Sequence, residues 1–457
     1  MPSRSCLSSL VLATAFAPLA EAATLIVSNT QDLFRPACTS DCSLREAIYQ
    51  ANNNPGPDRI ELRPGTYVLS LSDPIWNADE EPDPDEDVSA RGDLDIGGEL
   101  TIVGAGYDTT SIQGVSDRLI EILPGASVKL RYLSLRDGRA DTYGGAIRND
   151  GEAVIAYVGF YDNRATPGIQ GKGGAIANFG DLGVSFSLFR DNNSNGDEGF
   201  TGQGGAIYNL GTLLVRDTHF ENNSVTDNDV DYAHGGAIYN EGYADVSRSS
   251  FFGNRAGEYE GGGGGAAIVN NERGVFVLVN STLAGNIGTE VNGVVANGLS
   301  SYLPSGTEAS MQLVNVTLVA NQGLGLSNLG SMKVRNSIVA GNAYEAQPAN
   351  CGDQGGYFLG RGFMLGAGGG SCAHDLTLDD AQLFTQAMDP QVRSTGLGVE
   401  NGTQYYVLIQ GSPALDAGRG SCTSYDQRRM QRPRPGDRLA SAECDLGAFE
   451  RRLPWVE

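Results

Sequence analysis

Three aspartates alternate with other residues in one acidic stretch of the sequence, Asp227-x-Asp229-x-Asp231. Carboxylate oxygens are the ligands that Ca²⁺ prefers in proteins. The stretch lacks the glycine and the final glutamate of an EF-hand loop, so it is not an EF-hand. The spacing therefore predicts a metal site with Asp227, Asp229 and Asp231 as ligands, and Ca²⁺ as the cofactor that would fit them.

Similar insertions recur before and after this stretch, at Thr166–Lys172, Asn195–Gln203, Val225–His234 and Ala256–Glu260. They combine carboxylates with tyrosines, whose flat rings can pack against sugar rings. A solvated acidic edge is the alternative interpretation. The predicted binding residues for a cation or glycan are Asp197, Glu198, Asp227, Asp229, Asp231, Tyr232, Glu258, Tyr259 and Glu260.

The insertions separate copies of one repeated phrase. Gly-Gly-Ala-Ile followed two residues later by Asn occurs at 144–149, 173–178, 204–209 and 235–240, with a degenerate copy at 265–270. A second landmark follows each first one, an apolar residue with asparagine three positions later, as in Phe160/Asn163. Two registers with nearly the same spacing indicate a repeat architecture.

Short segments with alternating polarity lie between the landmarks, which is typical of strands bounded by tight turns. Parallel stacking of such repeats predicts an all-β, right-handed parallel β-helix, because β-propeller blades require longer repeats. We expect Ile147, Ile176, Ile207, Ile238 and Ile268 to form one buried ladder, and Phe160 to Phe251 an aromatic stack. The Gly-Gly pairs should bend the backbone before each strand. The asparagines should lie at turns, where Asn tolerates a left-handed backbone and bonds its own or neighbouring main chain.

The solenoid is predicted to span 58–345, between two caps at 23–57 and 346–457. An open β-helix end is an unpaired strand edge and needs covering. Ser43-Leu-Arg-Glu46 is a capping box, and Leu44, Ala47, Ile48 and Ala51 form one apolar helix face. A short helix should therefore close the N-terminal end, and a cysteine-containing module the other.

Residues 1–22 have the pattern of a signal peptide, with an apolar stretch and a small-x-small cleavage site, Ala20-Glu21-Ala22. No later stretch is long and apolar enough for a transmembrane segment. We therefore expect a secreted, extracellular or cell-surface protein.

Six cysteines remain after that cleavage, and an exported chain predicts disulfides between them. The simplest pairing is local, although six cysteines allow fifteen connectivities, and no Cys/His spacing supports a zinc site. The predicted pairs are Cys38–Cys42, Cys351–Cys372 and Cys422–Cys444.

The formal net charge is −24, and the only lysines are Lys129, Lys172 and Lys333. Such a chain repels phosphate backbones, which argues against a nucleic-acid partner. It suits divalent cations and neutral or cationic partners, or the charge serves solubility alone.

Three parts of the sequence resemble known families. Cys42-Ser-Leu-Arg-Glu-Ala-Ile48 resembles the CSLREA family of bacterial exported proteins, and the Gly-Gly-Ala-Ile-Tyr-Asn phrases resemble those of polymorphic outer-membrane proteins. Gly411–Gly418, Asp426–Arg428, Arg432-Pro433 and Cys444–Glu450 are similar to the choice-of-anchor Q domain. The resemblance implies a bacterial secreted or surface β-helix protein and no particular activity.

Catalysis remains the alternative to binding. A polysaccharide lyase needs a base near the α-proton of a uronate, and Arg216 and Arg248 on neighbouring coils are the candidates, against the interpretation that they only face solvent. A glycoside hydrolase needs two carboxylates at a separation that sequence does not give. The three histidines offer no Ser/His/Asp constellation. We therefore predict a non-catalytic protein that binds a polysaccharide or another surface ligand, with a pectate-lyase-like enzyme as the alternative.

Overall fold

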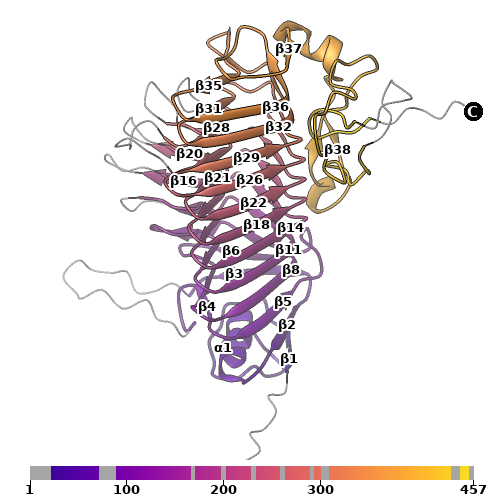
Figure 1. The fold of residues 1–457 in the computed structure, drawn as a ribbon. Coiled ribbons are helices and arrows are strands. Elements are labelled where there is room, and N and C mark those ends of the chain that lie inside the picture. Colours follow the sequence, from indigo (N-terminus) through magenta and orange to yellow (C-terminus); the bar gives the residue numbers. More distant parts are fainter. Residues whose placement is uncertain are drawn as a thin grey trace, which may run out of the picture.

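A computed structural model describes residues 22–71, 89–165, 170–196, 202–227, 233–257, 263–288, 293–299, 308–433 and 443–451. The chain is an all-β parallel solenoid, in which each coil adds strands to the same sheets, as predicted. Figure 1 shows the strands stacked as rungs along one axis, with the C-terminal residues folded back beside the upper coils.

Three parallel sheets form the walls of the solenoid. Within the described residues, the largest, sheet A, contains β1 (Thr24–Val27), β2 (Asp58–Leu62), β3 (Gly65–Leu69), β5 (Glu99–Val103), β6 (Thr110–Gly114), β8 (Ser127–Arg136), β11 (Glu152–Tyr161), β14 (Asp181–Ser185), β15 (Leu188–Arg190), β18 (Thr212–Arg216), β19 (His219–Glu221), β22 (Tyr243–Ser247), β23 (Ser250–Phe252), β26 (Val275–Val279), β27 (Thr282–Ala284), β29 (Ser310–Val314), β30 (Thr317–Val319), β32 (Ser331–Ala340), β36 (Tyr357–Gly366) and β37 (Leu376–Leu378). Sheet B contains β4 (Leu94–Ile96), β7 (Ile120–Ile122), β10 (Ile147–Asn149), β13 (Ile176–Asn178), β17 (Ile207–Asn209), β21 (Ile238–Asn240), β25 (Ile268–Asn270), β28 (Val295–Asn297), β31 (Leu326–Asn328) and β35 (Cys351–Asp353). Sheet C contains β9 (Arg139–Ala140), β12 (Arg164–Ala165), β16 (Asn193–Gly196), β20 (Ser224–Asp227) and β24 (Arg255–Ala256).

Smaller elements complete the described part of the chain. They are the helices α1 (Leu44–Asn53), η1 (Asp380–Gln382), η2 (Leu383–Ala387) and η3 (Val399–Asn401), and two antiparallel pairs, β33 (Ala343–Tyr344) with β34 (Gln347–Pro348) and β38 (Arg393–Ser394) with β39 (Gln404–Tyr405).

The predicted side-chain ladders are present. Ile147, Ile176, Ile207, Ile238 and Ile268 pair in register along sheet B, and all are fully buried. The rings of Phe160, Phe189, Phe220 and Phe251 stack at centroid distances of 4.4, 5.0 and 4.7 Å. Successive coils are separated by the distance between neighbouring strands of a sheet, about 4.8 Å. Identical apolar side chains can therefore stack at this spacing and fill the interior of every coil in the same way.

The repeated asparagines differ from the prediction in conformation. They do not adopt positive φ; instead, they are buried in two amide ladders that run along the axis. In the first ladder, each Nδ2 donates to the Oδ1 of the next asparagine at 2.6–3.0 Å, from Asn149 to Asn328. The second ladder runs in the same way from Asn163 to Asn350. Within a ladder, an interior asparagine such as Asn178 both accepts from one neighbour and donates to the other, whereas Oδ1 of Asn149 at the start of the first ladder has no partner among the described residues.

The glycine pairs bend the backbone as predicted. Gly144, Gly173, Gly204 and Gly235 have φ of 61–72°, which disfavours residues with a Cβ. The second glycine of each pair faces a neighbouring coil, and a Cβ on Gly174 would lie 2.2 Å from the carbonyl oxygen of Gly205. Both glycines are therefore required by the geometry of the coil.

The N-terminal helix α1 closes the first coil, and both halves of its predicted capping box are present. Leu44, Ala47, Ile48 and Ala51 are buried against the solenoid. Parallel pairing begins before the predicted solenoid, because β1 pairs with β2, and it continues to β37.

The structure joins Cys38 to Cys42, Cys351 to Cys372 and Cys422 to Cys444, which is the local pairing. Residues 379–433 and 443–451, here the C-terminal segment, run back along sheet A and form a second apolar core with it around Met364, Leu383 and Phe449.

Candidate functional site

Most of the predicted binding residues lie outside the described part of the chain. These are Asp197, Glu198, Asp229, Asp231, Tyr232, Glu258, Tyr259 and Glu260. Asp227 ends β20, and its side chain is also outside that part. The residues that follow the insertions are described, and Lys172, Gln203, His234 and Gly264 pair in parallel on successive coils. The insertions therefore rejoin the solenoid along one line, next to sheet B, while their proposed cation or glycan contacts remain predictions.

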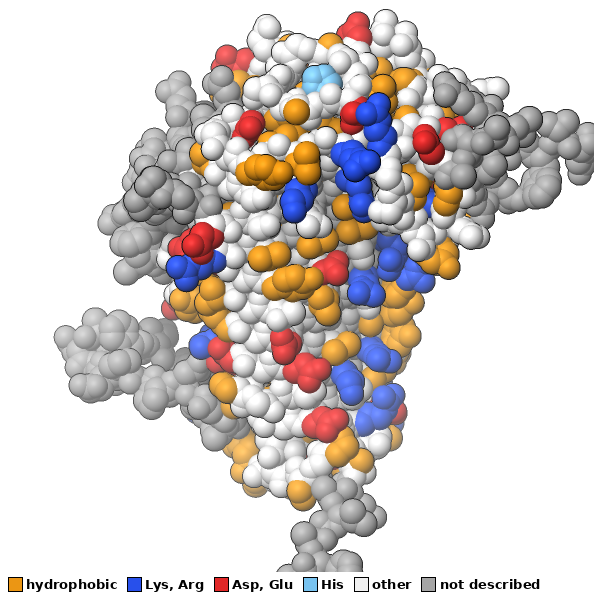
Figure 2. Space-filling view, in the orientation of Figure 1, with side chains coloured by type: hydrophobic (Ala, Val, Ile, Leu, Met, Phe, Trp, Pro, Cys, Tyr) orange, Lys and Arg blue, Asp and Glu red, His pale blue; other side chains and the backbone are white. Residues whose placement is uncertain are grey.

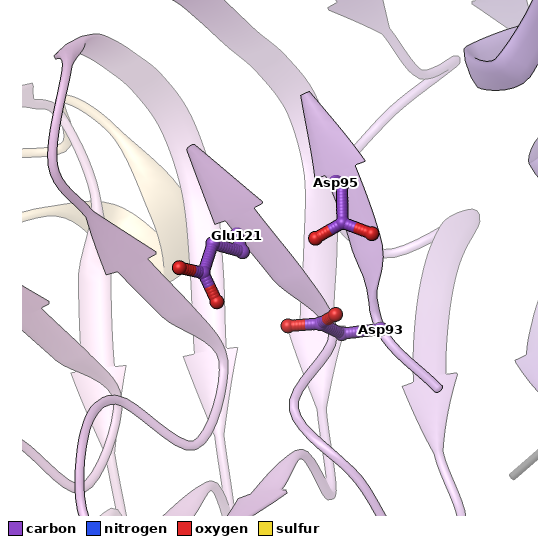
Figure 3. A group of neighbouring side chains, drawn as sticks. All are labelled: Asp93, Asp95 and Glu121. Carbon is purple, nitrogen blue, oxygen red and sulfur yellow. The ribbon is translucent and has the colours of Figure 1, made fainter. Parts of the chain in front are cut away.

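Three other carboxylates gather at the N-terminal end of sheet B, and we call them the acid cluster. Asp93 precedes β4, Asp95 lies within it, and Glu121 is the residue of β7 that pairs with Asp95. Oxygen atoms of all three lie within 4.8 Å of one another, and each residue is at most 6% exposed. Figure 3 shows the three carboxylates facing a common space between β4 and β7. Such a donor set suits a hard cation in charge and geometry.

Guanidinium groups already contact the acid cluster. Nη1 of Arg118 lies 3.1 Å from Oδ2 of Asp93 and also contacts Oε2 of Glu121. Arg148, from the next coil, approaches Oε1 of Glu121 at 3.4 Å. A cation would have to compete with these two arginines for the same oxygens. The cluster is therefore a buried network in which two arginines face three carboxylates, and Arg148 also pairs with Asp150. Sequence reasoning missed it because Glu121 lies 26 residues after Asp95.

Arg45 of α1 fixes the segment that carries Asp93. Its guanidinium is fully buried and donates to both carboxylate oxygens of Asp32, at 2.7 and 3.2 Å. It also donates to the carbonyl oxygens of Ser89, Arg91, Gly92 and Asp93 at 2.8–3.1 Å. The arginine of the Cys-Ser-Leu-Arg-Glu-Ala sequence thus ties the capping helix to the first coils and holds the acid cluster in place.

The outward face of sheet A carries a second set of charges, the arginine column, at the last residue of the first strand in each coil. Register places Arg131, Ala156, Ser185, Arg216, Ser247, Val279, Val314, Arg335 and Arg361 in one line. From Arg131 to Arg361 the column thus contains four arginines and no acidic residue. The same line continues from Arg131 through Val103 to Glu61, which pairs with Arg59. Figure 2 shows blue side chains along this part of the face, close to the C-terminal segment.

The arginines of the column lack the carboxylate partners that Arg118 and Arg148 have at sheet B. Arg131, Arg216 and Arg361 are exposed and have no ion pair with any described residue. Arg335 is half-buried and donates to Oγ of Ser421 at 2.9 Å, which neutralises no charge. Their guanidinium groups therefore remain available for an anionic ligand.

The acidic residues of the same face lie mostly away from the column. Glu99, Glu152 and Asp181 occupy one line of the sheet, four residues before the column on their strands. Four residues of strand span about 13 Å. That exceeds the screening length of about 8 Å at physiological salt. Asp245 is nearer, two residues before Ser247.

The two lyase candidates of the sequence differ in their surroundings. Arg216 belongs to the column, whereas Arg248, on the next coil, bonds Asp217 through Nε at 3.0 Å and Nη2 at 2.9 Å. Arg429 of the C-terminal segment bonds the same carboxylate at 3.2 and 2.9 Å. Two guanidiniums thus share Asp217, and this carboxylate, already paired with Arg248, holds Arg429 of the C-terminal segment.

An aromatic ladder adjoins the column at the turn that follows it. Tyr132, Tyr157 and Phe186 follow Arg131, Ala156 and Ser185, with φ of 56°, 57° and 52°. Left-handed backbone costs a non-glycine residue about 1–2 kcal/mol. The ring centroids of neighbouring residues lie 5.2 and 4.9 Å apart, and each such contact stabilises the stack by about 0.5–1.5 kcal/mol. At the corresponding turns of later coils the chain uses polar residues, such as Asn280, Asn315 and Asn336.

A Ser/His/Glu arrangement, absent from the sequence-based hypotheses, lies beneath the C-terminal segment. Nδ1 of His219 is 2.8 Å from Oγ of Ser250, and its Nε2 is 3.9 Å from Oε2 of Glu221. Ser250 has no exposed surface and accepts a hydrogen bond from the N–H of Gln404 at 2.9 Å. Burial lowers the pKa of His219 to about 4, so the imidazole is neutral near pH 7. Because no substrate can reach Ser250, these residues serve the packing of the C-terminal segment.

Comparison with known proteins gives one short repeat match and several solved structures of low similarity. Residues 217–241 match the Chlamydia polymorphic membrane protein repeat, and no curated protein matches the chain. Pectate lyase Pel9A is 14% identical over 95% of this chain and 98% of its own, with a TM-score of 0.40. The PL6 family alginate lyase AlyGC is 12% identical over 95% of this chain and 60% of its own, with a TM-score of 0.36. Likeness at this level says nothing of this chain's activity.

No helix among the described residues is long and apolar enough to cross a membrane. The repeat match and the stacked parallel coils agree in one conclusion. The chain is a β-helix repeat protein.

Proposed function

We propose that this chain is a secreted or cell-surface β-helix protein that binds a linear anionic polysaccharide along the arginine column, without cleaving it. The observation that carries the proposal is the column itself, in which Arg131, Arg216, Arg335 and Arg361 lie in register on an open sheet face with no acidic residue among them.

The spacing suits an extended polymer. Successive coils lie about 4.8 Å apart. Three coil steps separate Arg131 from Arg216 and four separate Arg216 from Arg335, about 14 and 19 Å on that spacing. Guanidinium groups bind carboxylates with two parallel hydrogen bonds. A rigid sheet fixes their positions before binding, so little additional ordering is required.

A net charge of −24 does not oppose this interaction at short range. Exposed charges separated by more than about 8 Å are screened at physiological salt. A carboxylate at the column therefore experiences mainly the nearest guanidinium groups. The distant acids weaken binding at low salt and slow the approach of the polymer.

Binding without cleavage is favoured by the composition of the column. Its outward side chains are arginine, alanine, serine and valine, so the column itself has neither a histidine nor a pair of carboxylates for acid–base catalysis. The lyase alternative would place the base at Arg216. Calcium at Asp227, Asp229 and Asp231 remains a separate proposal for the insertions.

The experiment compares the mature chain with two triple variants that lose the same charge. Arg131→Gln, Arg216→Gln and Arg361→Gln remove the column, whereas Arg139→Gln, Arg164→Gln and Arg273→Gln remove exposed arginines elsewhere. Each protein is titrated with size-defined polygalacturonate, alginate and neutral glucan, with Ca²⁺ or with a chelator. We expect the column variant to lose at least tenfold in affinity for the uronate polymers, and the control less than threefold.

Three results would count against the proposal. Equal losses in both variants would mean that general charge, and not the column, attracts the polymer. Uronate polymers that fail to bind the unaltered chain would remove the proposed function. Polymers shortened on size-exclusion chromatography by the unaltered chain, and left intact by Arg216→Gln alone, would establish the lyase alternative.

A further inference from the structure

The aromatic ladder is a departure from the usual choice of residues at left-handed turns. Glycine and asparagine adopt positive φ with the least strain. On later coils this chain has Asp217, Arg248, Asn280, Asn315 and Asn336 at the same turn, all of them polar. Three aromatic residues at consecutive coils keep the strained conformation. Backbone strain that is retained at an exposed position points to a role for the side chain.

The two ends of the ladder differ. At one end, the guanidinium of Arg429 lies 4.7 Å from the ring centroid of Phe186, so that end is covered. At the other end, Tyr132 is 44% exposed. The residue at the corresponding turn of the preceding coil is Gly104, because Val103 pairs with Arg131. Glycine has no side chain to stack there, and among the described residues the ring contact of Tyr132 is with Tyr157 alone.

We propose that Tyr132 and Arg131 form a terminal subsite for one uronic acid residue of the bound polymer. The pyranose would place its C–H face on the outer face of the Tyr132 ring, and its carboxylate on the guanidinium of Arg131, the adjacent residue in β8. This inference rests on the proposed function, and it specifies the ligand: a polymer of six-membered sugar rings with carboxylates, not any polyanion.

The remainder of the ladder supports the subsite instead of contacting the sugar. Tyr157 and Phe186 turn their faces to their neighbours in the stack, so only ring edges can meet the solvent. The stack fixes the orientation of Tyr132 through Tyr157, with which it makes an interplanar angle of 19°. An aromatic ring that is ordered before binding offers contact area at a low entropic cost.

The test uses Tyr132→Asn, a substitution that introduces the residue found at this turn on later coils and therefore preserves the fold. Tyr425→Asn is the control, because Tyr425 is 55% exposed in the C-terminal segment and makes no ring contact with a described residue of the ladder. The probes are a galacturonate oligomer and poly-γ-glutamate of equal charge, which share carboxylates but not sugar rings. A third probe is single-stranded oligothymidylate, whose bases could also stack on an exposed ring.

We expect Tyr132→Asn to weaken binding of the galacturonate oligomer about tenfold and that of poly-γ-glutamate less than twofold, with no effect of Tyr425→Asn. Saturation-transfer NMR should show the strongest transfer to the ring protons of one terminal sugar in the unaltered chain, and a loss of this signal in Tyr132→Asn.

Equal losses for both polymers, or none for galacturonate, would overturn the subsite while the arginine column stands. Tighter binding of oligothymidylate than of galacturonate would replace the sugar with a nucleic acid. Failure of the unaltered chain to bind either carboxylate polymer would overturn the proposed function, and the subsite with it.

Discussion

The acid cluster and the arginine column place charged side chains on neighbouring coils in two different ways. At sheet B, Asp93, Asp95 and Glu121 are buried and face Arg118 and Arg148. At sheet A, the arginines are at least partly exposed, and none of the four has a carboxylate partner among the described residues. Buried charges must be paired, whereas exposed charges need not be. Charges paired with opposite charges therefore identify the acid cluster as structural. Charges without such partners identify the arginine column as available to a ligand.

The difference also shows how little the net charge reveals about a surface. The chain as a whole is strongly acidic, yet sheet A carries four arginines in one line. Parallel stacking concentrates whatever residue occupies one position of each repeat into a continuous stripe. In a solenoid, the charge of the column matters more for recognition than the charge of the chain.

The largest effect is expected from Arg45→Met, which removes the most completely compensated guanidinium. Asp32 would keep a buried carboxylate without its partner, and four carbonyl oxygens would lose a donor. Breaking a buried pair in this way costs about 3–5 kcal/mol. Urea unfolding measures the loss, with Arg59→Met, an exposed arginine of β2, as the control. A loss of unfolding free energy below about 1 kcal/mol would mean that the buried carboxylate of Asp32 does not need a guanidinium partner.

A second effect concerns Asp445, a carboxylate of the C-terminal segment that borders the column. It accepts hydrogen bonds from the N–H groups of Asp416 at 2.9 Å and Arg451 at 2.6 Å, and burial raises its pKa to about 6. Because the folded state binds this proton more tightly than the unfolded state, the stabilising contribution is present below pH 4 and is lost as pH rises through 6. The pKa shift of about two units corresponds to about 3 kcal/mol at most.

The contribution of the Asp445 proton to stability can be measured by comparing the unfolding free energies of the unaltered chain and Asp445→Asn from pH 4 to pH 7. The variant lacks the titration and one acceptor, so it should be less stable at pH 4, and the gap should narrow towards pH 7. Parallel profiles would show that Asp445 does not titrate in this window.

Arg118→Met should have a smaller effect, because this side chain is 15% exposed and Glu121 retains Arg148. We expect a loss of about 2 kcal/mol at pH 7, which is the range for hydrogen bonds to charged groups. The loss should shrink at low pH, where protonation relieves the repulsion among the three carboxylates. The double variant Arg118→Met/Glu121→Gln should recover part of the stability, and strict additivity of the two changes would argue against coupling within the cluster.

The fold could be predicted because each repeat contains two independent landmarks. Glycine at Gly144 and its equivalents reports a backbone bend, and the isoleucine three residues later reports a buried wall. The conformation of the asparagines could not be predicted, since a buried amide ladder and a left-handed turn both favour asparagine. Only the register of neighbouring coils distinguishes them, and Asn149 donating to Asn178 decides for the ladder.

The candidate site was harder to predict for the same reason. Arg216 was identified as a candidate residue, but Arg131, Arg335 and Arg361 were not, because the coils between them differ in length. A signal was present, since Arg131, Arg216 and Arg335 each directly follow a buried apolar residue at the end of the first strand segment. Aligning the repeats on the second asparagine places Arg216 and Arg335 at the same position, seven residues before Asn223 and Asn342, whereas the coils of Arg131 and Arg361 have glycine in place of that asparagine. The insertions with Asp229 and Asp231 still await a test.

The smallest effect on stability is expected at the arginine column. A substitution there tests most directly whether the column serves ligand binding while the acid cluster serves folding. Arg216→Gln removes an exposed guanidinium with no described carboxylate partner, so the free energy of unfolding should change by no more than about 0.5 kcal/mol. The same change should lower uronate affinity about threefold to tenfold, with a shallower dependence on salt, because one cationic contact with the polymer is lost. Loss of stability without loss of affinity would make Arg216 a structural residue. The arginine column would then serve folding, as the acid cluster does, and not ligand binding. Loss of affinity alone would show that an uncompensated arginine contributes to recognition and not to folding.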